Sequence, residues 1–205
     1  MYLQTERLTL RRFRRDDLDA VVALDADPAV MRYITGGAAT PREELRDDYL
    51  PAWLAYYERG DRWGFWAAIE RATGEFLGWF HLRPNLGDPD DEPELGYRLV
   101  RSAWGRGLAT EGARALVDKA FGELDARRVY ATTMAVNAAS RRVMEKAGLR
   151  YVRTFHADWP VRIPGDEAGD VEYALDRAQW AADRTGVSRA DAGESRTDAG
   201  EAPPR

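Results

Sequence analysis

Two glycines separated by one residue, Gly105 and Gly107, stand where an apolar run gives way to a helix-forming run. Glycine lets the backbone approach a ligand closely, and the first N–H groups of a helix are free donors with partial positive charge. This combination binds phosphate, although the same glycines also suit an ordinary strand-to-helix turn. The segment has no GxxxxGK[ST] loop, and Thr110 occupies the place of the third glycine in a GxGxxG fingerprint. We therefore expect a phosphate site unlike those of P-loop and dinucleotide-binding proteins.

The composition restricts the class of protein that holds this site. The chain has 205 residues, 44% of them apolar, with 35 acidic and 30 basic side chains and a net charge of -5. This balance argues against nucleic acid as a partner. The absence of cysteine excludes disulfides and thiolate catalysis, and with two histidines we expect no metal site. No stretch is apolar enough for a signal peptide or membrane span, so we expect a cytoplasmic protein, monomeric or homodimeric.

Apolar periodicity places the glycines between a strand and a helix of a larger sheet. Thr40 and Glu43 form a capping box that opens one helix, and Pro51 should interrupt that helix. Hairpin-linked strands come early and β-α-β order comes later, which predicts an α+β (mixed α/β) domain with about six to seven strands flanked by helices. The expected strands are 7–13, 63–70, 75–82, 94–100, 128–134, 149–155 and 171–175, with helices from residues 16, 40, 108 and 137.

The C-terminal segment has a different character. Residues 184–205 contain one large apolar side chain, Val187, and repeat DAGE at 191–194 and 198–201. Such a segment buries too little apolar surface to offset its chain entropy. We therefore divide the chain into a folded domain, 1–183, and a disordered low-complexity tail, 184–205.

Three motifs resemble one known family. TERLTLRRF, ELGYRL followed by WGRGLATEG, and NAASRRVMEKAGLRYV occur in the order typical of the GNAT superfamily of acyl-CoA-dependent N-acyltransferases. The resemblance covers about residues 3–176 and is closest to the Rim-type ribosomal-protein N-terminal acetyltransferases. It implies a mixed sheet that splays open between its fourth and fifth strands, with acetyl-CoA as the co-substrate entering the split.

The resemblance also implies where acetyl-CoA is held. Main-chain N–H groups at the glycine turn would bind the pyrophosphate, and the pantetheine arm would pair like a strand with residues 97–100. Asn137 would contact the arm or order its turn, unless it is only a helix cap. The cofactor-binding residues expected on this basis are Leu99, Val100, Gly105, Arg106, Gly107, Leu108, Ala109, Thr110 and Asn137.

Attack of an amine on a thioester requires a base, because amines are mostly protonated at neutral pH. Glu94 matches the carboxylate position of the family and is the first candidate, although it also suits a solvated glutamate of the acidic loop 88–94. Asp158 is a second carboxylate candidate. His81 and His156 are weaker candidates, since a histidine at such a position is more often packed or exposed.

The leaving thiolate needs a proton, and the developing oxyanion needs a donor. Ser140 matches the family's hydroxyl near the thioester sulfur and is the candidate proton donor. Many relatives place a tyrosine further along this helix, where Met144 stands here, so water is the alternative to Ser140. The Tyr97 N–H is the candidate oxyanion donor.

These features predict an N-acetyltransferase that acts by direct attack in a ternary complex. The acceptor is a primary amine, of a protein N-terminus or of a small molecule, and the acidic loop 88–94 would attract its positive charge. The alternative from another class is a CoA-binding sensor or interaction module without turnover. Met144 favours this alternative, because it replaces the tyrosine of many relatives and cannot donate a proton. A third reading is a transferase for longer or acidic acyl groups.

Overall fold

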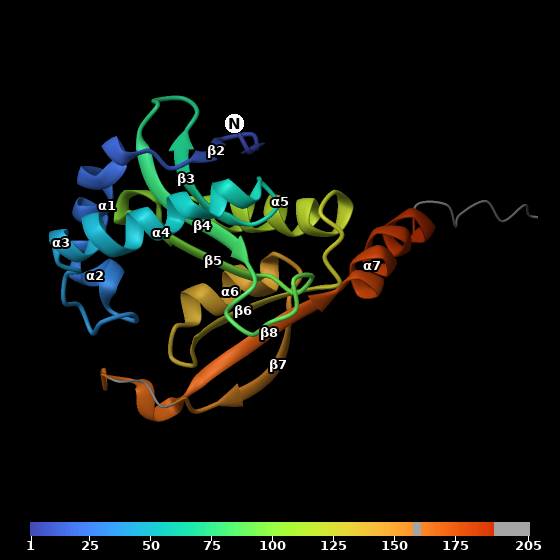
Figure 1. Ribbon diagram of the computed structural model, residues 1–205. Helices are drawn as coiled ribbons and strands as arrows, with labels where there is room; N and C mark the ends of the chain where they lie inside the picture. The colour runs from blue at the N-terminus through green and yellow to red at the C-terminus, as the bar shows by residue number, and fades with distance from the viewer. Residues whose placement is uncertain (158–160, 191–205) are drawn as a thin grey trace, which may run out of the picture.

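Eight strands form one mixed sheet in the order β1-β2-β3-β4-β5-β6-β8-β7 (Figure 1). The computed structural model describes residues 1–157 and 161–190, with side chains described up to residue 185. Neighbouring strands are antiparallel except β5 and β6. The strands are β1 Leu3–Gln4, β2 Leu8–Arg12, β3 Gly64–Glu70, β4 Phe76–Arg83, β5 Glu94–Leu99, β6 Arg128–Met134, β7 Arg150–Phe155 and β8 Asp170–Asp176. The predicted mixed α/β class is confirmed, with the two-residue β1 as an additional strand.

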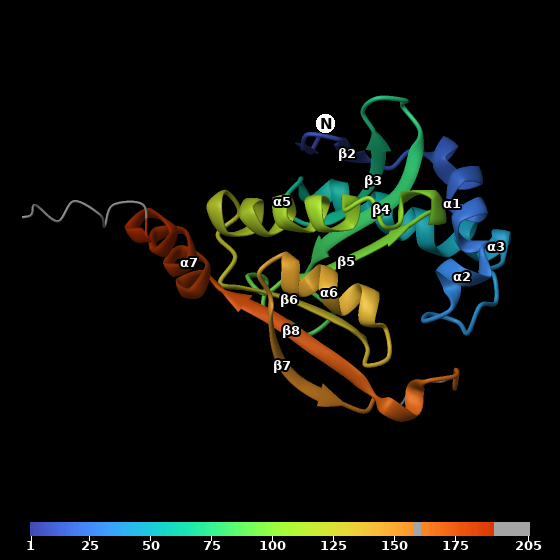
Figure 2. The same ribbon diagram turned by 180° about the vertical axis from the view of Figure 1, so that it is seen from behind.

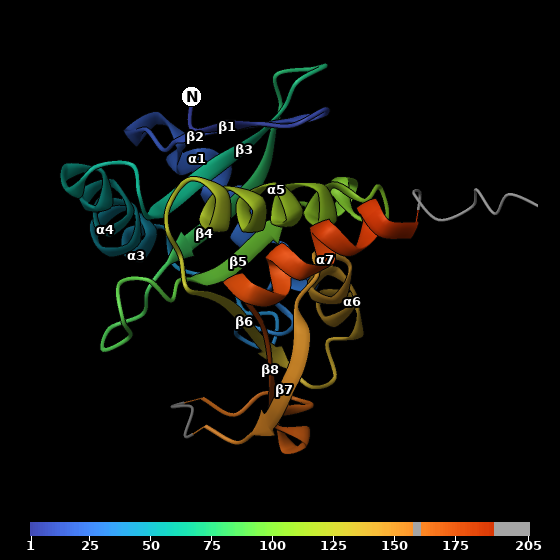
Figure 3. The same ribbon diagram turned by 90° about the vertical axis from the view of Figure 1, so that its right-hand side faces the viewer.

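Helices cover both faces of the sheet. The described helices are α1 Leu18–Asp25, α2 Pro28–Met31, α3 Arg42–Glu44, α4 Leu50–Ala55, α5 Leu108–Gly122, α6 Ala138–Lys146 and α7 Arg177–Ala190. α5 and α6 pack on one face, which Figure 2 shows in front, and α1 to α4 lie on the other. Figure 3 shows α3 and α4 on one side of the strands and α6 on the other. Each face of the sheet is thus covered by its own set of helices.

The helix predicted from residue 40 differs in its start and in its interruption. The Thr40 hydroxyl donates to Asp25 Oδ2 at 2.8 Å rather than capping, and α3 begins after Pro41 without a side-chain cap. Because proline has no N–H, regular α-helix is replaced before Pro51 by a π-helical turn, Leu45–Tyr49. Asp25 is almost fully buried and also pairs with Arg98 on β5 at 2.5 Å. The ion pair fixes α1 against the sheet, and the Thr40 hydrogen bond attaches the segment before α3 to α1.

The C-terminal helix continues past the predicted start of the tail. Residue 184 lies within α7, and Arg184 pairs with Asp118 on α5 at 2.7 Å. The Trp180 ring packs on Phe121, with ring centroids 5.5 Å apart. The rest of the predicted tail, 191–205, lies outside the described residues. No helix among the described residues is long and apolar enough to cross a membrane.

Candidate active site

The sheet opens between β5 and β6. The two strands share one residue pair, Glu94 with Tyr130, whereas β5 and β4 pair along their length. Beyond this pair the strands diverge, as Figure 2 shows. The split therefore begins at Glu94, between the fourth and fifth strands that the sequence predicted.

The backbone of β5 presents free groups to this split. Val100 N–H donates to Leu77 O on β4 at 2.9 Å. Hydrogen-bonding groups alternate in direction along an antiparallel strand, so Gly96 and Arg98 face β4 while Tyr97 and Leu99 face the gap. The main-chain groups of Tyr97 and the Leu99 N–H are therefore available to an extended ligand, whereas Leu99 O accepts from Trp104 Nε1 at 2.8 Å. Val100 is not available, because its carbonyl also accepts from Ala103 N at 3.0 Å.

The predicted phosphate turn lies at the N-terminus of α5. Gly105 and Gly107 have φ angles of 71° and 78°, the left-handed region that favours glycine. Gly107 is the N-cap residue and no side chain caps the helix, which leaves the first-turn N–H groups of Leu108, Ala109 and Thr110 available. A methyl group added at Gly105 would meet nothing within 4 Å. The turn therefore presents its N–H donors to open space.

Arg7 and Glu70, which are far from the turn in the sequence, both contact Arg106 and so hold the turn in place. Arg7 Nη1 donates to Arg106 O at 2.8 Å, and Arg7 also pairs with Glu111 at 2.7 Å. Glu111 accepts from Thr5 Oγ1, and Arg106 pairs with Glu70 on β3. We did not single out Arg7 or Glu111 from the sequence, although both lie within the motifs that carry the family resemblance.

Glu94 lies at the vertex of the split on the α1–α4 face. Its two carboxylate oxygens accept from Asn85 Nδ2 at 3.0 Å and from Thr132 Oγ1 at 2.8 Å. Asn85 Nδ2 also donates to the Tyr130 hydroxyl at 2.7 Å. These contacts from β6 and from the loop after β4 fix the carboxylate at the opening of the gap.

Ser140 lies on the other face of the split, in the first turn of α6. The Tyr97 hydroxyl is 3.0 Å from Ser140 Oγ and 3.1 Å from Ser140 O. Asn137 caps α6, since its Oδ1 accepts from Ser140 N at 3.2 Å and its Nδ2 donates to Thr133 Oγ1. Met144 is buried in the core. The structure thus brings Tyr97, Ser140 and Glu94 to one split, with Glu94 across the sheet from the two hydroxyls.

The comparisons agree with this geometry. Residues 7–150 match the family model described as acetyltransferase (GNAT) domain. The chain belongs to the GNAT acetyltransferase family. It is 35% identical over 184 residues to the FsC-acetyl coenzyme A-N(2)-transacetylase of Aspergillus fumigatus, covering 87% of this chain and 77% of the relative.

Solved GNAT structures share the fold. An acetyltransferase of the GNAT family from Bacillus anthracis has a TM-score of 0.71 and 26% identity, covering 87% of this chain and 99% of that one. The RimL ribosomal L7/L12 alpha-N-protein acetyltransferase in complex with coenzyme A has a TM-score of 0.70 and 19% identity, covering 85% and 97%. The predicted resemblance is confirmed, and this chain is an acetyl-CoA-dependent N-acetyltransferase.

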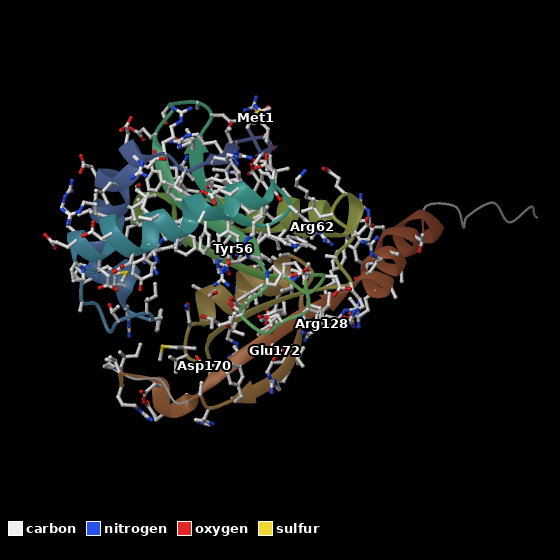
Figure 4. All side chains as sticks on the ribbon, viewed as in Figure 1. Met1, Tyr56, Arg62, Arg128, Asp170 and Glu172 are labelled. Carbon is white, nitrogen blue, oxygen red and sulfur yellow. The ribbon has the colours of Figure 1, made fainter. Side chains whose placement is uncertain are left out.

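A pocket of about 320 Å³ adjoins Glu94 in this GNAT domain. Asp88, Glu94 and Tyr130 form the wall at the vertex. Arg128 on β6 and Glu172 on β8 form another part of the lining and pair at 2.6 Å (Figure 4). Glu172 also pairs with Arg153, and Glu92 with Arg127 and Arg128. Among the described residues, Asp88 and Glu94 pair with no lysine or arginine, so the vertex is the negative part of the pocket.

The other candidates from the sequence occupy different positions. Asp158 lies outside the described residues. His156 Nε2 is 3.3 Å from Glu167 O within the loop before β8. His81 Nε2 is 3.9 Å from Glu94 Oε2, and a Cβ on Gly96 would overlap the His81 ring at 2.1 Å. Gly96 therefore makes room for His81 beside the candidate base.

The buried imidazole of His81 predicts a pH dependence of stability. Burial lowers the pKa of His81 well below its ordinary value, and the charges of Arg83 and Arg98 lower it further. As the pH falls below about 6.5, the unfolded chain takes up a proton there and the folded chain does not, so folding is destabilised. We expect the unfolding free energy to fall by up to about 1.4 kcal/mol per pH unit from this group. Urea unfolding of the wild type and of His81→Leu between pH 5 and 7 isolates this contribution. If the unfolding free energy changed with pH equally in both proteins, the prediction would be contradicted.

Proposed function

We propose that this enzyme transfers the acetyl group of acetyl-CoA to a primary amine by direct attack in a ternary complex. The observation that carries the proposal is the split at the Glu94–Tyr130 pair, with free main-chain groups on one strand. Pantetheine paired along Tyr97 and Leu99 would direct the thioester to the vertex, while the α5 N-terminus holds the pyrophosphate.

The residues around the vertex supply what the reaction needs. The amine nitrogen attacks the thioester carbon from the α1–α4 face, and the Tyr97 N–H stabilises the developing oxyanion. Glu94, fixed by Asn85 and Thr132, takes the proton that the nitrogen loses. The C–S bond then breaks, and its electron pair leaves with the sulfur toward Ser140.

The pocket beside Glu94 is our proposed acceptor site. Its negative vertex attracts the ammonium form of an amine, which loses one proton to water there before the neutral nitrogen attacks beside the base. The name of the Aspergillus fumigatus relative specifies acetylation at N(2), which supports an amine nitrogen as the acceptor. The ribosomal acetyltransferase among the structural neighbours supports the same nitrogen chemistry on a protein.

The test is CoA release measured across a panel of acceptors at saturating acetyl-CoA. The panel contains peptides with free N-termini, small primary amines, and their N-acetylated forms as controls. We expect thiol release that depends on a free amine. A protein that binds CoA tightly yet releases none with any amine would instead be a CoA-binding module. A burst of CoA release without acceptor would contradict direct attack.

A further inference from the structure

The side chain of Tyr97 extends from β5 to α6, the helix that follows β6. Its hydroxyl lies 3.0 Å from Ser140 Oγ and 3.1 Å from Ser140 O, and its ring packs on Phe80 with centroids 5.9 Å apart. The same residue presents its main-chain N–H to the gap. One tyrosine therefore links the backbone that would hold the thioester with the hydroxyl on the opposite side.

Ser140 has a defined partner set on α6. Its N–H is engaged by the Asn137 cap at 3.2 Å, and its hydroxyl is within hydrogen-bond distance of the Tyr97 phenol. Met144, one turn further along α6, is buried in the core and its thioether cannot donate a proton. Within the described part of α6, Ser140 is therefore the hydroxyl that lies at the split.

On the basis of the proposed function, we infer that the Tyr97 phenol is a positioning residue that directs the Ser140 hydroxyl hydrogen toward the departing sulfur. A hydroxyl has one hydrogen and can accept from another donor. When the phenol donates to Ser140 Oγ, the serine hydrogen is left for the sulfur, and each hydrogen bond polarises the other. The alternative acceptor, Ser140 O, holds the phenol in place before the thiolate develops.

This arrangement supplies a hydrogen bond and requires no net transfer from tyrosine. Burial raises the pKa of Tyr97 to about 12, so the phenol keeps its proton at neutral pH. A free thiol has a pKa of roughly 8.5, so the thiolate leaves as an anion stabilised by Ser140 and takes its proton from water. The amine proton goes to Glu94, which balances the reaction. Tyr97 on β5 would thus support the leaving group through Ser140, since Met144 on α6 cannot donate a proton to it.

The test combines Tyr97→Phe, Ser140→Ala and the double variant, with Tyr173→Phe as the matched control. Tyr173 also joins the sheet to α6 through its hydroxyl, which donates to Glu145 at 3.0 Å, but its partners are Arg141 and Glu145 rather than Ser140. We expect Tyr97→Phe and Ser140→Ala each to lower kcat about tenfold across the pH range, with KM for acetyl-CoA unchanged. The double variant should lose no more than Ser140→Ala, because the phenol acts through the serine. Tyr173→Phe should keep its kcat.

Two results would overturn the inference. Additive losses in the double variant would mean that the phenol does not act through Ser140. A lower Tm or a higher KM in Tyr97→Phe with unchanged kcat would mean a purely structural role. Both results require a wild-type enzyme that is active. A wild-type protein without amine-dependent CoA release would instead contradict the proposed function itself.

Discussion

Replacing Glu94 with glutamine lowers kcat about 10²-fold or more at neutral pH, within the range that a positioned general base contributes. Glutamine keeps the size of the side chain and can still accept from Thr132 or Asn85, so the vertex keeps its shape. It cannot take the proton of the attacking amine. The measurement is the pH–rate profile of CoA release at saturating acetyl-CoA and acceptor. We expect the profile to change in form as well as in height.

Asp91→Asn is the matched control for this variant. Asp91 lies in the same acidic segment, pairs with Arg127 at 3.6 Å and does not line the pocket. Its substitution removes the same charge and should leave kcat within about twofold, because an exposed charge pair contributes little. If Glu94→Gln left the pH–rate curve untouched, Glu94 would not be the base. Equal losses in both variants would assign the effect to the charge of the segment instead.

The order of elements was predictable from the sequence because it depends on local signals. Apolar periodicity marks β5 and β6, and the glycines mark the turn at the start of α5. The motif resemblance added that β5 and β6 separate, which no local pattern contains. In the structure these strands pair in the sheet only at Glu94 and Tyr130.

The contacts that hold the candidate residues were not predictable, because they depend on strand register and on long-range contacts. Arg7 and Glu111 are 104 residues apart and meet only when β2 lies beside the α5 turn. Asn85 and Tyr130 support Glu94 from a loop and from the neighbouring strand. The sequence pointed to Tyr97 for its backbone N–H, whereas its side chain also contacts Ser140. A single sequence carries no signal for such pairings.

The variant Gly107→Val should weaken CoA binding about 10²-fold or more. Gly107 has a φ of 78°, which a β-branched residue adopts only with strain of about 1–3 kcal/mol. The Cβ of the valine would lie 3.6 Å from Arg7 Nη2, and its two methyl groups would add bulk at the N-cap of α5. A pyrophosphate could then no longer reach the N–H groups closely. Calorimetric titration with CoA gives the Kd directly.

Gly74→Val separates the loss of the binding surface from backbone strain. Gly74 has nearly the same φ, 76°, but lies in the β3–β4 hairpin, where a Cβ would meet nothing within 4 Å. Both variants should lower Tm by similar amounts, because both carry the same backbone strain. Only Gly107→Val should lose affinity for CoA, because only that position faces the proposed pyrophosphate. If both variants bound CoA like the wild type, the pyrophosphate would have to be held elsewhere, and the thioester would no longer be directed to the split at Glu94.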